Sequence, residues 1–174
     1  MKTIDSKNPP FNPTPTLARR LLMWLFGKGY ETMSGAGMCP VYLERWVMFE
    51  ALKCGVYLHR FIGDDWAIDP HDHPRRFISI GLKGWYWEDI YRNPATDPAA
   101  SLLPTQLMET RKHVAPWIRS FPADHLHRVR AKECGDCWTL VIVLPKSRAW
   151  GFVQDGIWIP FKQYVFGGKA RGDC

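Results

Sequence analysis

From residue 41 onward the chain is a succession of short apolar and aromatic runs, each closed by glycine, proline or other turn residues. Within 56–62 (VYLHRFI), the side chains of Tyr57, His59 and Phe61 alternate with others and share one face of a strand. Residues 41–52 fit helix and strand equally well, and little helix is expected beyond them. Roughly nine short strands are predicted, at 56–62, 77–82, 85–91, 108–114, 117–121, 126–131, 138–144, 150–153 and 157–165. Such a pattern is typical of a β-sandwich, a jelly roll or a barrel.

The first 30 residues have a different character. Residues 1–16 form a Pro-rich arm, and Thr16 is placed to cap a helix over 17–26 (LARRLLMWLF) that Gly27 and Gly29 end. We expect this helix to pack on the domain or on a partner chain, with an amphipathic membrane anchor as the alternative. The sequence thus predicts an N-terminal arm and short helix over 1–30 and one β-barrel domain over 31–174.

Composition and charge limit the class of function. The hydrophobic share of 46% and the aromatic share of 14% exclude a disordered chain. A net charge of +6 indicates either a mildly basic surface or an anionic ligand, such as a small phosphorylated or carboxylated compound or a nucleic acid. The nine tryptophans could stack on nucleobases, but several lie among apolar residues of predicted strands. Packing in the core or at a dimer interface is therefore favoured over nucleic-acid binding.

Cysteine usage and the N-terminal region bear on the compartment. The five cysteines are an odd number, and a chain of 174 residues does not need disulfide bonds for stability, so we infer a reducing compartment. The longest apolar run near the N-terminus, Leu21–Phe26, is too short for a signal peptide or a membrane span. We expect a cytoplasmic protein that does not bind membranes. The lone CxxC motif at 134–137 is interpreted as a hairpin turn, with a reversible disulfide as the alternative.

Two pairs of histidines are the strongest chemical signal. In 69–79 (DPHDHPRRFIS), His71 and His73 are two positions apart at the start of a predicted strand. Such residues point to the same side, so both imidazoles can reach one metal ion at about 2.0–2.2 Å. A third ligand has to come from a distant strand, and 120–129 (SFPADHLHRV) offers His125 and His127. The alternative is that these histidines cap turns or hydrogen-bond to carboxylates.

The order of these residues resembles the two motifs of the cupin superfamily, whose fold is a small double-stranded β-helix, or jelly roll. The matching positions are, in chain order, His71, His73, Gly84, Pro122 and His127. Asp124 replaces the glycine of the second motif. The resemblance covers about residues 56–153 and implies a cupin-type jelly roll. The chain also resembles uncharacterised phage- and bacteria-associated cupin-like proteins with the segments YLHRF, HDHP, HRV and WGF, a likeness that implies no activity.

One position departs from the cupin pattern. The glutamate of the first motif falls on Phe77, whose ring cannot coordinate a cation. The resemblance then implies a three-histidine site formed by His71, His73 and His127. This set is similar to that of thiol dioxygenases of the cysteine dioxygenase type, which bind Fe(II). Zn, Mn and Ni are alternative metals, because imidazole suits several divalent cations.

Three further residues are candidates for catalysis. Glu88, on the next predicted strand, and His59 are each a candidate fourth ligand, and Glu88 is also a candidate acid or base. His125 either acts beside the metal ligands or replaces His127 as the third ligand.

Arginine residues near the histidines are candidates for binding an acidic substrate. Arg75 shares the strand parity of His71 and His73, and the guanidinium group suits carboxylate and phosphate. Arg60 and Tyr57 are the other substrate-binding candidates. The alternative for these arginines is a solvated basic rim.

We therefore expect a metal-dependent small-molecule enzyme, most specifically a three-histidine Fe(II) dioxygenase that acts on a small anionic substrate. One alternative is a sugar-nucleotide isomerase or epimerase, in which a side chain moves the proton and a metal is optional. Another is a non-catalytic binding or host-interaction module. A homodimer is expected, because small open β-rolls often bury an outer apolar sheet by pairing two subunits.

Overall fold

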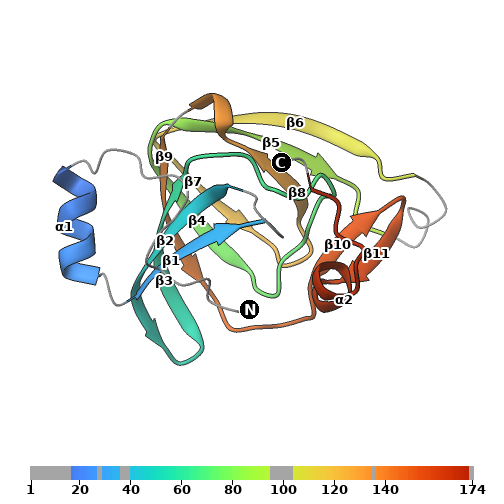
Figure 1. Ribbon diagram of the computed structural model, residues 1–174, viewed down its shortest axis with the longest axis horizontal. Coiled ribbons are helices and arrows are strands. Elements are labelled where there is room, and N and C mark those ends of the chain that lie inside the picture. Colours follow the sequence, from blue (N-terminus) through green and yellow to red (C-terminus); the bar gives the residue numbers. More distant parts are fainter. Residues whose placement is uncertain (1–16, 27–28, 36–39, 95–103, 135, 173–174) are drawn as a thin grey trace.

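The computed structural model describes residues 17–26, 29–35, 40–94, 104–134 and 136–172. Eleven strands and two α-helices lie in this part of the chain (Figure 1). The strands are β1 (Tyr30–Ser34), β2 (Val41–Ala51), β3 (Cys54–Phe61), β4 (Phe77–Lys83), β5 (Trp85–Tyr91), β6 (Leu107–Val114), β7 (Trp117–Phe121), β8 (Leu126–Arg130), β9 (Cys137–Val143), β10 (Gly151–Gln154) and β11 (Ile157–Pro160). The helices are α1 (Leu17–Phe26) and α2 (Phe161–Phe166), and a 3-10 turn, η3, spans Lys132–Cys134. The predicted mainly-β fold class is confirmed.

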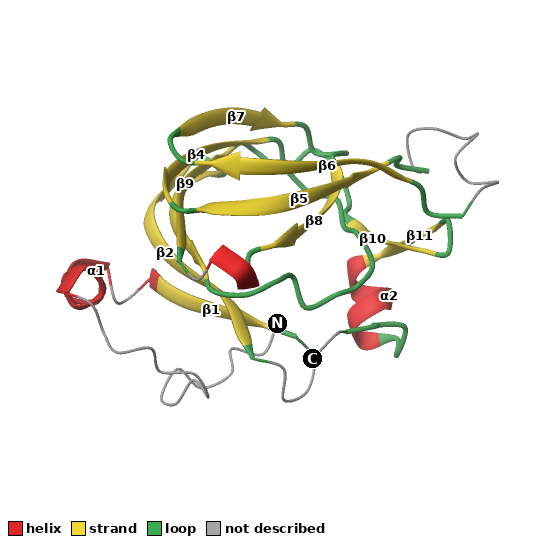
Figure 2. Ribbon diagram, turned by 90° about the horizontal axis from the view of Figure 1, so that it is seen from above, coloured by secondary structure: helices red, strands yellow, loops and turns green. Residues whose placement is uncertain are grey.

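Two antiparallel sheets form the walls of a jelly roll. The larger sheet has the strand order β1-β2-β3-β9-β4-β7, and the smaller has the order β6-β5-β8. The β10-β11 hairpin lies beside the smaller sheet, and α2 packs on this hairpin (Figure 2). Neighbours such as β3 and β9 are far apart in the sequence. The roll therefore brings distant segments together.

Alternate side chains of both sheets meet in the interior. Tyr86 and Val129 from the smaller sheet pack with Cys137 from the larger sheet, and Phe61 and Trp117 border this cluster. Complete burial of one such apolar side chain contributes roughly 1.5–3 kcal/mol. These residues form an apolar layer that joins the two sheets. A second cluster joins α2 to the β10-β11 hairpin and consists of Ala67, Phe152, Ile159 and Tyr164.

The N-terminal helix has the bounds that the sequence predicts. Leu17 and Trp24 of α1 are 82% and 80% exposed, so the described residues cover little of its apolar surface. We expected this helix to pack on the domain, but little of its apolar surface is buried there. No described helix has the length and apolar character that crossing a membrane requires. The predicted arm at 1–16 lies outside the described residues.

Most of the predicted strands are confirmed. The predictions at 85–91 and 117–121 coincide with β5 and β7, and the ambiguous segment at 41–52 is strand β2. Strand β1 was not predicted. It pairs with β2 from Tyr30 to Ser34, and its five residues show little apolar alternation.

The prediction of a strand over 157–165 is wrong in its second half. Strand β11 ends at Pro160, and helix α2 begins at Phe161. Proline has no N–H for a sheet ladder but is tolerated at a helix start. Tyr164 is fully buried and stacks on Phe152 with ring centroids 4.0 Å apart, so tertiary packing favours the helix.

The CxxC segment is also built differently from the predicted tight hairpin. Cys134 ends the 3-10 turn η3, while Cys137 begins β9 and is 1% exposed. Gly135 lies outside the described residues. Cys137 is thus a small apolar residue of the core.

Candidate metal centre

The segment that carries His71 and His73 is not the start of a regular strand, as the sequence suggested. It precedes β4 and is held by isolated bridges from His71 to His127 on β8 and to Phe152 on β10. The N–H of His71 donates to the carbonyl of His127 at 2.9 Å, and the reciprocal bond is 3.0 Å. The backbone therefore joins two of the predicted ligands directly.

Asp72, between the two histidines, fixes their orientation. Its side chain is fully buried and accepts hydrogen bonds from Gly151 N–H at 2.7 Å, from Trp158 Nε1 at 3.0 Å and from the Arg148 guanidinium. Adjacent residues of an extended segment point to opposite sides. Anchoring Asp72 on one side therefore directs both imidazoles to the other.

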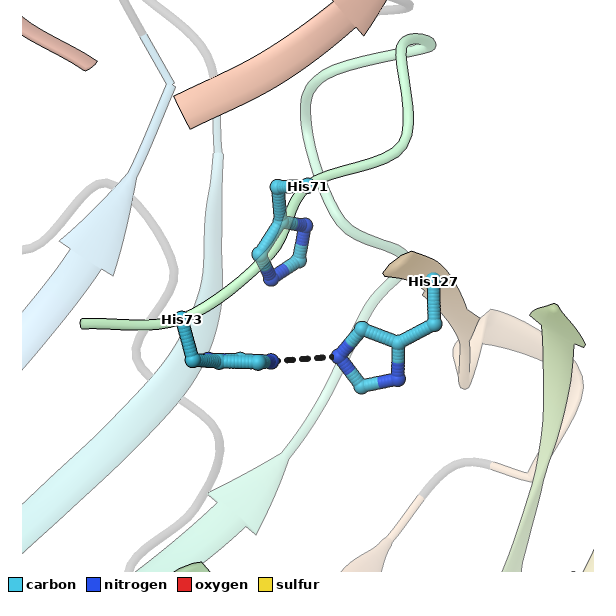
Figure 3. A group of neighbouring side chains, drawn as sticks. All are labelled: His71, His73 and His127. Carbon is cyan, nitrogen blue, oxygen red and sulfur yellow. Dashed lines mark hydrogen bonds between the residues drawn. The ribbon is translucent and has the colours of Figure 1, made fainter. Parts of the chain in front are cut away.

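His71, His73 and His127 converge as the sequence predicts (Figure 3). Each offers a ring nitrogen, and these three atoms lie within 4.8 Å of one another. The Nε2 atoms of His73 and His127 are 2.8 Å apart. Two nitrogens bound to one ion at about 2.1 Å lie roughly 3.0–3.4 Å apart for bond angles of about 90–110°. The arrangement is thus close to what a bound ion imposes.

The imidazoles are suited to act as neutral ligands. Burial lowers the pKa of His71 to about 4, although the carboxylates of Asp65 and Asp72 oppose this shift. Burial, with the neighbouring imidazoles, also holds the pKa of His73 well below its usual range. Metal ions bind the deprotonated nitrogen of histidine. No proton has to be displaced from these two rings at neutral pH.

Glu88, on β5, lies at the centre of a second group of histidines. Its carboxylate is fully buried and accepts from His127 Nδ1 at 2.6 Å, from His125 Nε2 at 2.8 Å and from His113 Nε2 at 2.7 Å. Burial disfavours the charged form, but these three bonds outweigh it and hold the pKa of Glu88 well below its usual range. We refer to Glu88, His113, His125 and His127 as the Glu88 cluster.

Glu88 also sets the tautomer of His127. A carboxylate can only accept, so His127 Nδ1 carries the proton and Nε2 presents its lone pair toward His73. His71 Nδ1 faces the Asp65 carboxylate at 3.7 Å, which is longer than a hydrogen bond. Metal-bound histidines commonly have such a carboxylate partner on the other nitrogen. The donor set therefore fits a divalent cation at His71, His73 and His127.

An alternative ligand set exists in the same place. Glu88, His125 and His127 also offer ligand atoms within 4.8 Å of one another. In this group a Glu88 oxygen already accepts hydrogen bonds from the N–H groups of His125 and His127, so these polar atoms have partners without an ion. The three-histidine set is therefore the better candidate, with the Glu88 cluster as its support.

Phe77 lies where the resemblance places a glutamate. Its ring centroid is 4.7 Å from that of His73, and it stacks on Phe121 at 4.8 Å. An apolar wall thus borders the histidines on this side. The neutral ligand set inferred from the sequence is consistent with this geometry.

The other predicted site residues are not brought to the three histidines. Arg75 is half-buried and donates to the carbonyls of Lys53 and Leu144. Arg60 pairs with the carboxylates of Glu44 and Asp136.

Two candidates on β3 also have partners elsewhere. Tyr57 donates to Glu50 at 2.6 Å, and His59 Nε2 accepts from Arg45 Nε at 3.0 Å. Among the described residues, no hydrogen bond joins Tyr57 or His59 to the three histidines.

His113 is a site residue that the sequence analysis missed. It lies on β6, opposite Tyr86 of β5, and is 3% exposed. His113 lies beside Glu88 only because β6 pairs with β5 in this register, and the sequence does not give the register. A regular alternation of apolar and polar residues over 107–114 would have been the only sign in the sequence that His113 faces the interior.

Comparisons with known proteins agree with the fold. No protein-family model and no curated protein matches the sequence. A cupin-2 domain protein from Rhodospirillum rubrum is similar in structure with a TM-score of 0.53 at 15% identity, over 84% of this chain and 85% of that chain.

Two further solved structures are similar at lower scores. HppE in its Fe(II) form has a TM-score of 0.48 at 9% identity, over 67% of this chain and 57% of its own. A sugar phosphate isomerase of the cupin superfamily from Silicibacter pomeroyi has a TM-score of 0.45 at 12% identity, over 65% and 66%. The match thus covers less than two thirds of the length of HppE and of the sugar phosphate isomerase.

These likenesses concern the fold alone. The chain has a cupin-type jelly-roll fold, similar to that of the Rhodospirillum rubrum cupin-2 domain protein. Within that fold the described residues provide a possible three-histidine metal site.

Proposed function

We propose that this protein is a metal-dependent small-molecule enzyme of the cupin type. His71, His73 and His127 would hold one divalent cation, with Fe(II) favoured and Zn, Mn or Ni as the other candidates. The observation that carries the proposal is the convergence of three ring nitrogens, supplied by two distant segments, within 4.8 Å. The support of His127 by a buried carboxylate strengthens it.

The neutral ligand set favours dioxygenase chemistry on a small anionic substrate. A cation held by three imidazoles keeps its full 2+ charge and open positions, and it would supply Lewis-acid chemistry and, as Fe(II), redox chemistry toward dioxygen. Phe77 and Phe121 line one side of the histidines and exclude water there. The Glu88 cluster keeps the His127 proton on Nδ1 throughout.

Metal analysis is the first test. Purified protein should contain close to one equivalent of Fe, Mn, Ni or Zn, and a His71→Ala variant should lose it. Fe(II)-loaded protein should then consume oxygen with small thiol carboxylates. Metal in the wild type without oxygen uptake on any thiol would remove the dioxygenase, and metal-free protein that no divalent cation stabilises would overturn the proposal in favour of a binding module.

An isomerase or epimerase is the second candidate. The observation that favours it is the 2.8 Å bond between His125 Nε2 and Glu88 Oε1, a pair that could move a proton without a metal. His125 has 18% of its side chain exposed, so a substrate can reach it. Proton exchange between substrate and D2O in metal-free protein, lost in His125→Gln, would favour this reading.

The remaining sequence predictions belong with this proposal. The cytoplasmic location, the homodimer, the phage association and the small anionic substrate are each part of it. Gel filtration with light scattering tests the homodimer directly.

A further inference from the structure

Strand β7 presents three side chains to the interior of the roll. The ring of Trp117 lies 5.8 Å from Tyr86 and 5.2 Å from His113, both on the opposite sheet. Phe121 lies 5.2 Å from His125, also across the interior. Arg119 has the same parity as these two residues and lies between them on the strand. Its guanidinium is therefore on the inner side, beside the Glu88 cluster.

The protonation of His113 leaves the Arg119 guanidinium without a hydrogen-bond acceptor on that residue. Arg119 Nη1 lies 3.4 Å from His113 Nε2, while Glu88 Oε2 lies 2.7 Å from the same nitrogen. Because an ionised carboxylate can only accept, His113 Nε2 carries a proton and donates it to Glu88. The same nitrogen cannot also accept from Arg119. Among the described residues, no ion pair joins Arg119 to a carboxylate within 4.0 Å.

Two buried polar atoms near Arg119 also have no partner in the described part of the chain. They are Trp117 Nε1 and Thr139 Oγ1. Both residues pair with Gly81 of β4 in the sheet register, so they flank it on the inner face. A Cβ on Gly81 would lie 2.2 Å from Trp117 Nε1, which shows that the indole crosses the strand there. An unsatisfied buried donor costs about 1–3 kcal/mol.

Ser79 lies between these atoms and Arg119 in the register of the sheet. It is directly opposite Arg119 in the β4-β7 register and 5% exposed. Residues opposite each other in antiparallel strands have Cβ atoms about 4.5–5.5 Å apart, and Gly81 is one pleat repeat away. Arg119, Ser79, Trp117 and Thr139 thus place a guanidinium, an indole N–H and two hydroxyl groups on one area of the inner face. We call these four residues the inner donor set.

We propose that the inner donor set binds the carboxylate of a small organic substrate. The inference rests on the proposed function, because it assigns the substrate-binding residues of that same site. A carboxylate offers two oxygens with about four lone-pair positions, which matches a guanidinium fork and two or three single donors. A phosphate dianion carries more charge than one arginine beside the anionic Glu88 balances.

Arg119 suits this role better than the arginines chosen from the sequence. Arg60 already has two carboxylate partners, and Arg75 already donates to two carbonyls outside the interior. Arg119 is half-buried and combines an inner position with the lack of an acceptor. The site for the acidic group is therefore on β7.

Binding to chelator-treated protein tests the proposal separately from the metal centre. We would titrate acetate, pyruvate, malonate and inorganic phosphate and follow the indole N–H signal of Trp117 by 1H–15N NMR, assigned with Trp117→Phe. A carboxylate should shift this signal in the wild type. Arg119→Gln should weaken binding at least about tenfold, since bonds to charged groups are the strong ones.

Two further variants test the assignment, the first as a control and the second as a member of the inner donor set. Arg76→Gln removes an exposed guanidinium that donates to Ser120 of β7, and it should bind like the wild type. Thr139→Val removes a hydroxyl that has no partner, so it should weaken carboxylate binding without lowering the melting temperature. Thermal melting of every variant shows whether it is folded.

Several results would overturn the inference. They are a Trp117 signal that no carboxylate moves, tighter binding of phosphate than of any carboxylate, or unchanged carboxylate affinity in a folded Arg119→Gln variant. The metal content of the untreated protein is measured in parallel. Carboxylate binding in a protein that never holds metal would therefore refute the proposed enzyme and leave the binding site in place.

Discussion

His73 Nε2 lies 2.8 Å from His127 Nε2, although 54 positions separate the two residues in the sequence. A shared proton or a shared metal ion can hold two imidazole nitrogens this close. His127 already donates from Nδ1 to Glu88, so its Nε2 offers only a lone pair. A metal ion would accept lone pairs from both rings and from His71, which a shared proton cannot do.

The first prediction separates the two candidate ligand sets, which share His127. Zinc at a hundred times its dissociation constant should stabilise the wild type by about 2.7 kcal/mol, a rise in melting temperature of about 5–10 °C for a chain of this size. His73→Ala should abolish this rise, and His125→Ala should keep it. Differential scanning fluorimetry with Zn(II) measures both. The opposite pattern would assign the ion to Glu88, His125 and His127.

The second prediction concerns Glu88 as a positioning residue. In Glu88→Gln an NH2 group replaces one carboxylate oxygen, so at least one histidine N–H faces a donor instead of an acceptor. The His127 ring then loses its fixed tautomer, and metal affinity should fall about 10–100-fold. Competition with a fluorescent zinc chelator measures the affinity. Glu109→Gln, at an exposed position of β6 beside Arg111, is the matched control and should leave the affinity unchanged.

Local sequence patterns were sufficient for much of the fold and for two of the segments that converge at the candidate metal centre. Gly84 and Pro116 mark the starts of β5 and β7, and both strands were predicted with correct bounds. The pair His71 and His73 was found because its spacing does not depend on register, whereas His127 was chosen over His125 only through the cupin resemblance. His113 and Arg119 were missed because each reaches the site only through the pairing of strands that are distant in the sequence. Arg75 was misplaced by extending strand parity into a segment that is not a regular strand.

The third prediction concerns the support of the His71–His73 segment. Asp72→Asn should reduce the free energy of unfolding by about 3 kcal/mol, because it removes the buried partner of Arg148 and places an amide against several donors. Metal affinity should fall with it, since both imidazoles depend on this anchor. Urea denaturation measures the stability. Asp155→Asn, at a position with 75% of the side chain exposed, should change it by no more than about 0.5 kcal/mol. A loss in the control as large as that in Asp72→Asn would contradict the assignment.

The fourth prediction concerns His59, which lies apart from the metal ligands. Burial and the adjacent Arg45 guanidinium hold the pKa of His59 well below 6.5 in the folded protein. Tyr57, the other titratable neighbour, stays neutral because burial raises its pKa to about 12. In the unfolded chain His59 regains a pKa of about 6.5. As the pH falls below that value, His59 binds a proton in the unfolded state but not in the folded state, so the free energy of unfolding decreases.

This contribution is fully present above pH 6.5 and is lost on acidification. His59→Gln keeps an acceptor for Arg45 but cannot titrate, so between about pH 6 and 5 the wild type should lose about 1 kcal/mol per pH unit more than the variant. The other histidines contribute equally to both proteins and cancel in the comparison. Urea denaturation at half-unit pH intervals measures the two slopes. Parallel slopes would mean that His59 is protonated in the folded state, and Arg45 could then not donate to its Nε2.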